Sequence, residues 1–169
     1  KGVIKFDGAV TSIGYRAFST CSNLIEFSIP DSVTSIGFSA FSECTNLQKF
    51  HGKFASEDGR CLIVDGILKA FAPAELTGYT IPNSVKRIGD SVFKDCSSLT
   101  EVTIPNSVTI IGQAAFYGCS SLTEITIPNS VKAIEYHVFN GCSSLTKVII
   151  PNSIAGIGSY VFNECSSLT

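Results

Sequence analysis

Cysteine spacing raises the first chemical question in this sequence, because thiols can bind metals or form disulfides. A zinc site needs close pairs such as C-x-x-C, and the sequence contains none. A disulfide needs Cβ atoms about 3.8 Å apart, which cysteines stacked one strand spacing apart do not provide. We therefore expect reduced, buried thiols that behave as small apolar groups, with Cys61 outside their column. The other six cysteines fall into two runs with a 23-residue step: Cys21 and Cys44, then Cys96, Cys119, Cys142 and Cys165.

Histidines and carboxylates supply no catalytic arrangement either. We expect His51 at an outward strand position and His137 in a surface turn, and neither lies at a meaningful spacing from a nucleophile. The phosphate-binding loop, G-x-S-x-G and H-E-x-x-H motifs are absent. Glu26, Glu101 and Glu124 share an outward column that could bind a cation weakly, although a solvated face is the simpler interpretation. The sequence therefore predicts no enzyme, no cofactor and no metal site.

Bulk composition narrows the classes of partner. The 169 residues are 44% apolar, which is enough to build the core of one domain. A net charge of −2 gives no reason to expect a nucleic-acid partner. Charged residues make up only 15%, and polar uncharged residues fill the difference, which is typical of extracellular β-rich proteins. No apolar run approaches the roughly 18 residues that a transmembrane helix needs.

One phrase of 23 residues recurs through the chain and explains the cysteine spacing. Its consensus is L-x-x-V/I-x-I-P-N-S-V-x-x-I-G-x-x-A/V-F-x-x-C-S-S. A unit of this size cannot bury its apolar side alone, so stacked copies must share a continuous core in one domain. The seven units of this single solenoid domain are 1–23, 24–46, 47–75, 76–98, 99–121, 122–144 and 145–167.

Each part of the repeat has a physical interpretation. In "LTEVTIP", Val102 and its apolar neighbours alternate with polar residues, as in a half-buried strand, and Pro105 ends the strand because it lacks an N–H. "VTIIG" predicts a second short strand, and "AAFYGC" predicts one helical or 3-10 turn that places Phe116 in the core. Equivalent phenylalanines should form one internal column: Phe18, Phe41, Phe93, Phe116, Phe139 and Phe162.

The unit 47–75 departs from the consensus and is six residues longer than the others. Its segments "RCLIV" and "ILKAF" flank Asp65-Gly66, a dipeptide suited to a type I′ turn, so a β-hairpin is expected. This hairpin has two interpretations. It is either a structural variation that splits the solenoid into two blocks, or a protruding loop that contacts a partner.

The repeat resembles the BspA-like leucine-rich repeats over essentially the whole chain, in six good copies. The resemblance implies a curved, right-handed solenoid with the "LTEVTI" strands on its concave side. It also implies a bacterial cell-surface or secreted protein, because that family is implicated in adhesion and in binding host proteins. Comparable hairpin units occur in the family, which favours the structural interpretation of unit 47–75.

These observations favour an extracellular or cell-surface binding module for a protein or glycan ligand, with a host extracellular protein as one candidate. The alternative is a structural spacer that displays another domain, and an enzyme built from scattered residues is the least favoured. The chain begins at Lys1 without a methionine or signal peptide, and its last unit stops within a repeat. We therefore expect a fragment of a longer array, or ends that associate between molecules. The candidate ligand-binding residues are Glu26, Gln48, Lys49, His51, Glu101, Glu124 and Lys147.

Overall fold

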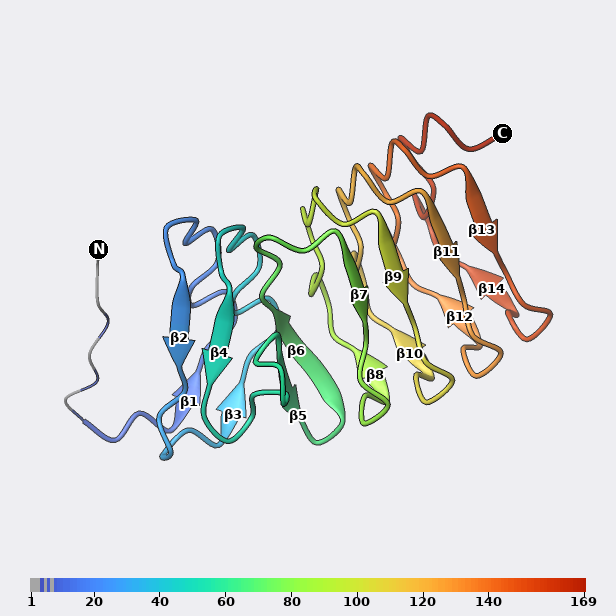
Figure 1. Cartoon of the computed structure of the whole chain (residues 1–169). Coiled ribbons are helices and arrows are strands. Elements are labelled where there is room, and N and C mark those ends of the chain that lie inside the picture. The colour runs from blue at the N-terminus through green and yellow to red at the C-terminus, as the bar shows by residue number, and fades with distance from the viewer. Residues whose placement is uncertain (1–3, 5, 7) are drawn as a thin grey trace.

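Equivalent residues of successive repeats lie side by side along the molecule (Figure 1). The computed structural model describes residues 4, 6 and 8–169, so part of unit 1–23 lies outside the described residues. Parallel strands pair with a register of one repeat, so that Glu124 aligns with Glu101 and Ile134 aligns with Ile157. The predicted stack of parallel-stranded coils is confirmed.

Three-residue strands form one side of the stack, which we call the strand face. In each one the middle side chain points inward: Val102 is buried, while Glu101 and Thr103 on either side of it are exposed. The last four of these strands form one sheet in the order β13-β11-β9-β7, and β2 pairs with β4 in a separate sheet. The strands are β2 (Glu26–Ser28), β4 (Lys49–His51), β7 (Gly78–Thr80), β9 (Glu101–Thr103), β11 (Glu124–Thr126) and β13 (Lys147–Ile149).

Two-residue strands form a second column, and all of them except β1 (Ser12–Ile13) follow a proline turn. The serine of the P-N-S segment joins neighbouring coils there, because Ser107 Oγ donates to the Val85 carbonyl at 2.8 Å and Ser153 Oγ donates to the Val131 carbonyl at 2.8 Å. The serine in the consensus therefore bonds across coils as well as occupying a turn. The strands are β1 (Ser12–Ile13), β3 (Ser35–Ile36), β8 (Arg87–Ile88), β10 (Ile110–Ile111), β12 (Ala133–Ile134) and β14 (Gly156–Ile157).

The segments around each core phenylalanine are turns, so the prediction of a helical or 3-10 turn in every repeat was wrong. No helix occurs among residues 4, 6 and 8–169. The reason is the backbone on either side of the phenylalanine: Ala114 and Gly118, around Phe116, have φ values of 53° and 69°. Two left-handed residues separated by three others interrupt any right-handed helix.

These turns hydrogen-bond to the next coil instead of to themselves. The Phe116 N–H donates to the Val138 carbonyl at 2.9 Å, and the Gly118 N–H donates to the Asn140 carbonyl at 2.8 Å. Turns in the preceding and following repeats donate in the same direction, as the Phe93 N–H does to the Ala115 carbonyl at 2.8 Å. The alternating backbone conformation therefore aligns the N–H groups of the turns around Phe18, Phe93, Phe116 and Phe139 towards the following coil.

The phenylalanine column is present and stacked. The rings of Phe93 and Phe116 lie 4.9 Å apart with an interplanar angle of 2°, and Phe139 continues the stack at 5.5 Å from Phe116. In the irregular unit, Phe71 takes the missing place, with its ring 4.7 Å from that of Phe93. Phe18 and Phe41 form a separate stack in the other core cluster, with their rings 5.2 Å apart, so the predicted single column is divided into two at the irregular unit.

A β-hairpin replaces the usual features of unit 47–75. β5 (Cys61–Val64) and β6 (Ile67–Phe71) pair antiparallel, and both Asp65 and Gly66 have positive φ, as a type I′ turn requires. β6 then pairs with β8, giving the sheet order β10-β8-β6-β5.

The hairpin lies between two separate clusters of core side chains. Leu62 packs with the N-terminal block, and Leu68 packs with the C-terminal block. Both side chains are fully buried. The predicted hairpin is present and its strands pack on both blocks, while a contact between this unit and a partner stays a prediction.

Six of the seven cysteines are buried and all seven are free, as predicted except for Cys21, which is exposed. Four thiols of the column donate to a phenylalanine carbonyl one coil earlier, for example Cys119 Sγ to Phe93 O at 3.1 Å and Cys142 Sγ to Phe116 O at 3.2 Å, whereas Cys96 Sγ contacts Lys94 O in its own turn. Burial raises the pKa of the Cys142 thiol to about 12. These thiols are therefore protonated core groups near neutral pH.

Candidate functional site

The candidate residues of the N-terminal block lie together on the strand face. Glu26 on β2 aligns with Lys49 on β4, and His51 Nε2 lies 3.2 Å from Glu26 Oε2. The Gln48 amide donates to Glu75 Oε1 at 3.1 Å. The charged side chains of this group are exposed and carry both signs, so they can contact a polar partner without first breaking a buried network.

The candidate residues of the C-terminal block form a second group. Glu124 lies between Glu101 and Lys147 in the register of β9, β11 and β13. Lys147 Nζ is 3.8 Å from Glu124 Oε2, and the two side chains are 62% and 64% exposed. An ion pair this exposed adds at most about 1 kcal/mol to stability.

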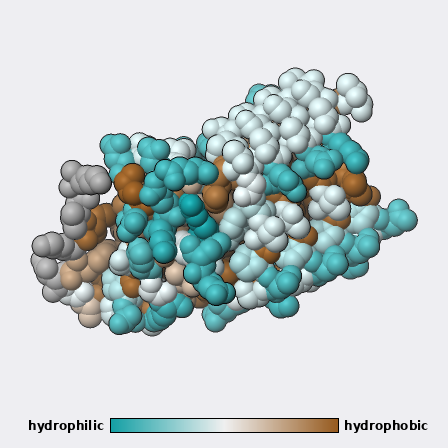
Figure 2. Space-filling model, viewed as in Figure 1, coloured by the Kyte–Doolittle hydropathy of each residue, from teal (hydrophilic) through white to brown (hydrophobic). Residues whose placement is uncertain are grey.

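The structure does not bring all seven candidates into one cluster. β4 and β7 do not pair, so the sheet carrying Glu101, Glu124 and Lys147 ends at β7. In Figure 2, viewed as in Figure 1, hydrophilic and near-neutral residues predominate over the strands, with apolar side chains in small areas between them. No group of three or more potential metal ligands occurs in the part of the chain that the structure describes.

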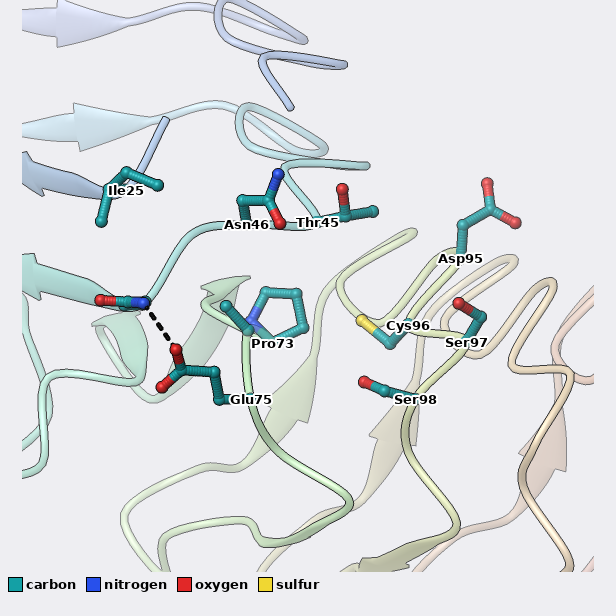
Figure 3. A pocket seen from close by; sticks show the side chains of 11 residues that line it. Ile25, Thr45, Asn46, Pro73, Glu75, Asp95, Cys96, Ser97 and Ser98 are labelled. Carbon is teal, nitrogen blue, oxygen red and sulfur yellow. Dashed lines mark hydrogen bonds between the residues drawn. The ribbon is translucent and has the colours of Figure 1, made fainter. Parts of the chain in front are cut away.

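A pocket of about 310 Å³ lies where the strand face is interrupted. Its lining comes from both blocks and from the segment that leaves the hairpin (Figure 3). Glu75 and Gln48 form one side, while the side chains of Cys96, Ser97 and Ser98 point towards Pro73 from the other. We call it the junction pocket.

Electrostatics at the junction favour positive charge. The pocket lining includes the carboxylates of Glu75 and Asp95 and no lysine or arginine. Burial raises the pKa of Asp95 above its ordinary value, although Lys94 Nζ lies 3.9 Å from Asp95 Oδ2. The neighbouring Lys94 is engaged by Glu43 at 2.6 Å.

Sequence reasoning did not single out the junction pocket. Gln48, which directly precedes β4, is the only pocket residue among the seven candidates. One signal was available: Ile25 occupies the place that Thr77, Thr100 and Thr123 hold in later repeats. Such an apolar replacement at an outward position, beside an irregular unit, indicates a local surface feature.

The threonines that directly precede β9, β11 and β13 donate hydrogen bonds to the backbone. Thr100 Oγ1 donates to Thr77 O at 2.9 Å, and Thr123 Oγ1 and Thr146 Oγ1 each donate to the threonine carbonyl one coil earlier, at 3.2 and 3.1 Å. Their hydroxyl protons therefore join coils rather than contacting external groups.

The two histidines have polar partners but no nucleophile beside them. His51 contacts Glu26, and His137 Nδ1 lies 3.1 Å from Asn140 Nδ2, with its ring stacked on that of Tyr160. Neither contact includes a hydroxyl or thiol that the imidazole could activate. Within the described residues, we found no helix with the length and apolar character needed to cross a bilayer.

Comparisons with known proteins agree with the geometry. The profile described as "BspA type Leucine rich repeat region (6 copies)" matches residues 3–55 and 68–169. The unmatched segment, 56–67, contains β5 and the hairpin turn. A search of curated proteins found no match.

Solved structures of bacterial leucine-rich repeat proteins resemble this chain. A T. pallidum leucine rich repeat protein is 32% identical, with a TM-score of 0.66 over 95% of this chain and 72% of its own. A leucine rich cell surface protein from Faecalibacterium prausnitzii A2-165 is 30% identical, with a TM-score of 0.75 over 95% of this chain and 50% of its own.

The pneumococcal vaccine antigen PcpA is 24% identical and supports the fold alone, with a TM-score of 0.82 over 98% of this chain and 42% of its own. This chain therefore spans half or less of the length of two of these three proteins. With six copies of the repeat matched over most of its length, the chain belongs to the BspA type leucine-rich repeat family.

Proposed function

We propose that this chain is a non-catalytic binding module that contacts a protein ligand through its strand face. The observation that supports this proposal is a row of exposed side chains of both charges, which lie on short strands over a buried core. Because the core fixes the backbone, these side chains form a surface whose positions are set before binding, which lowers the entropic cost of association. The proposed contact set is Glu26, Gln48, Lys49, His51, Glu101, Glu124 and Lys147.

The proposed setting is the bacterial surface or the extracellular medium, with adhesion to a host extracellular protein as the role and a glycan as the alternative ligand. The F. prausnitzii relative, named a cell surface protein, supports this location. The low content of charged residues, 15%, also fits it. A catalytic role has no support from the two histidines, whose contacts are those of surface residues.

The test is binding to immobilised extracellular-matrix and plasma proteins, together with a glycan array, measured by biolayer interferometry. The strand-face variant combines E26A, K49A, E124A and K147A, which removes two charges of each sign and leaves the net charge unchanged. The control variant combines K132A and E135A, which are exposed elsewhere and also cancel in charge. We expect the strand-face variant alone to lose affinity by at least about tenfold. Equal binding by all three proteins would reject the contact set.

A structural spacer is the second candidate function, and an ion pair between the two blocks favours it. The Lys94–Glu43 ion pair at 2.6 Å joins the blocks across the hairpin, as expected of a rigid display element. Absence of any protein or glycan ligand in the same binding experiment would favour the spacer over the binding module.

A further inference from the structure

The junction pocket is built differently from the rest of the strand face. Elsewhere the coils stack closely, but here β4 and β7 do not pair, and a hollow of about 310 Å³ opens between the blocks. The hollow lies beside the proposed contact set, because Ile25 directly precedes β2 and Gln48 directly precedes β4. A ligand lying along the strand face would therefore pass over the pocket.

One wall of the pocket is apolar. It consists of Ile25, Pro73 and Ala74, and Ile25 is 37% exposed although it is a large hydrophobic residue. The methylene groups of a long side chain can pack against this apolar wall, and burying them there is favourable.

The polar part of the pocket presents oxygen atoms from two sides. Glu75 Oε1 accepts a hydrogen bond from Gln48, and no contact of Oε2 was found among the described residues. Ser97 and Ser98 place hydroxyl groups opposite (Figure 3). A carboxylate facing separate hydroxyls suits an ammonium group, whose three donors point in different directions, better than a planar guanidinium.

We propose that the junction pocket accepts a lysine side chain of the protein ligand, with its aliphatic stem along Ile25 and Pro73 and its ammonium group at Glu75. This inference rests on the proposed function, because the lysine belongs to a protein that contacts the strand face. The pocket is large enough for one long side chain, and its volume is at the lower end for small-molecule sites, which are roughly 300–1,000 Å³.

The experiment titrates ¹⁵N-labelled protein with Nα-acetyl-lysine amide and follows backbone amide shifts by NMR. The uncharged isostere Nα-acetyl-norleucine amide and the planar cation Nα-acetyl-arginine amide are titrated in parallel. We expect the lysine probe to produce saturable amide shifts at Gln48, Glu75, Ser97 and Ser98. The arginine probe should bind with at least about fivefold lower affinity, and the norleucine probe should produce no saturable shifts.

The E75Q variant should bind the lysine probe with at least about fivefold lower affinity, because the substitution removes the negative charge and keeps the shape of the side chain. E135Q is the matched control, since it removes the same charge from an exposed residue outside the pocket. Shifts that do not saturate, that norleucine reproduces, or that E75Q leaves unchanged would overturn the inference. The proposed function would survive that result if the strand-face variant still lost its protein ligand, so the two proposals can fail separately.

Discussion

Left-handed residues are the feature that most constrains individual positions in this repeat. Each regular turn holds one such residue two positions before its core phenylalanine and one two positions after it. Only Gly118 and Gly141 are glycines at these places; elsewhere Thr20, Glu43 and others adopt positive φ. Holding an L-residue in this conformation costs about 1–2 kcal/mol. The inter-coil hydrogen bonds of the turns must offset that cost in each repeat.

Gly118 and Gly141 allow the backbone cost to be separated from crowding. A Cβ on Gly118 would overlap Asp95 Oδ1, whereas a Cβ on Gly141 would meet Gly118 Cα at an ordinary 3.5 Å. Urea unfolding should show that G141A loses about 1 kcal/mol and that G118A loses more, because the Asp95 side chain must also move. A smaller loss for G118A than for G141A would contradict this account of the turn.

At the scale of elements, the cysteine column behaves as a row of buried acids. Each buried thiol keeps its proton in the folded state: burial raises the pKa of Cys44 to about 11 and of Cys142 to about 12, from an ordinary value of 9.0. The unfolded chain loses these protons at lower pH than the folded chain. Their contribution to stability is therefore complete below pH 9 and is lost as the pH rises towards the folded-state pKa.

The free energy of unfolding should fall steeply above pH 9, and removing one thiol should reduce the slope. Between pH 9 and 11, we expect the free energy of unfolding of the C142A variant to fall by about 1.4 kcal/mol per pH unit less than that of the unmodified protein. The C21A variant, which removes the exposed cysteine, should keep the steeper slope. Guanidinium unfolding curves at several pH values test this, and identical slopes for all three proteins would show that buried thiols do not control alkaline stability.

At the scale of the whole molecule, the hairpin packs between the two hydrophobic core clusters and connects them. Its two faces pack against different blocks, and the blocks also meet directly through the ion pair between Lys94 and Glu43, whose side chains are 28% and 25% exposed. Lys69 and Arg87 add further contacts by lying over the Phe38 ring at 3.9 and 5.5 Å. These contacts connect the two blocks at the irregular unit, and the junction pocket lies on one side of this connection.

A double-mutant cycle measures how strongly the ion pair couples the blocks. The single variants E43Q and K94M keep the shape of the side chains, and the double variant removes both charges. We expect a coupling free energy of about 0.5–1 kcal/mol from urea unfolding, because the pair is close but partly exposed. Additive effects of the two substitutions would show that packing of the hairpin alone holds the blocks together.

Periodicity allowed the coils, the inward residues and the phenylalanine column to be predicted, because a 23-residue register leaves one consistent way to stack equivalent side chains. The Asp65-Gly66 turn was predictable from local chemistry. The turn conformation was not: Ala114 and Tyr160 are residue types without a preference for positive φ, and the hydrogen bonds of the turns to the next coil are not visible in the sequence. The junction pocket was missed because it depends on how an irregular unit fits between two regular ones. The role of the seven surface candidates stays a prediction.

The one-directional N–H groups of the turns give the solenoid a polarity that its repeated sequence does not reveal. One end of a turn column presents donors and the other presents acceptors, so a coil can be added in a single orientation only. Two copies meeting at these ends would have to join head to tail. Head-to-tail contacts of this kind build rings or filaments rather than two-fold dimers.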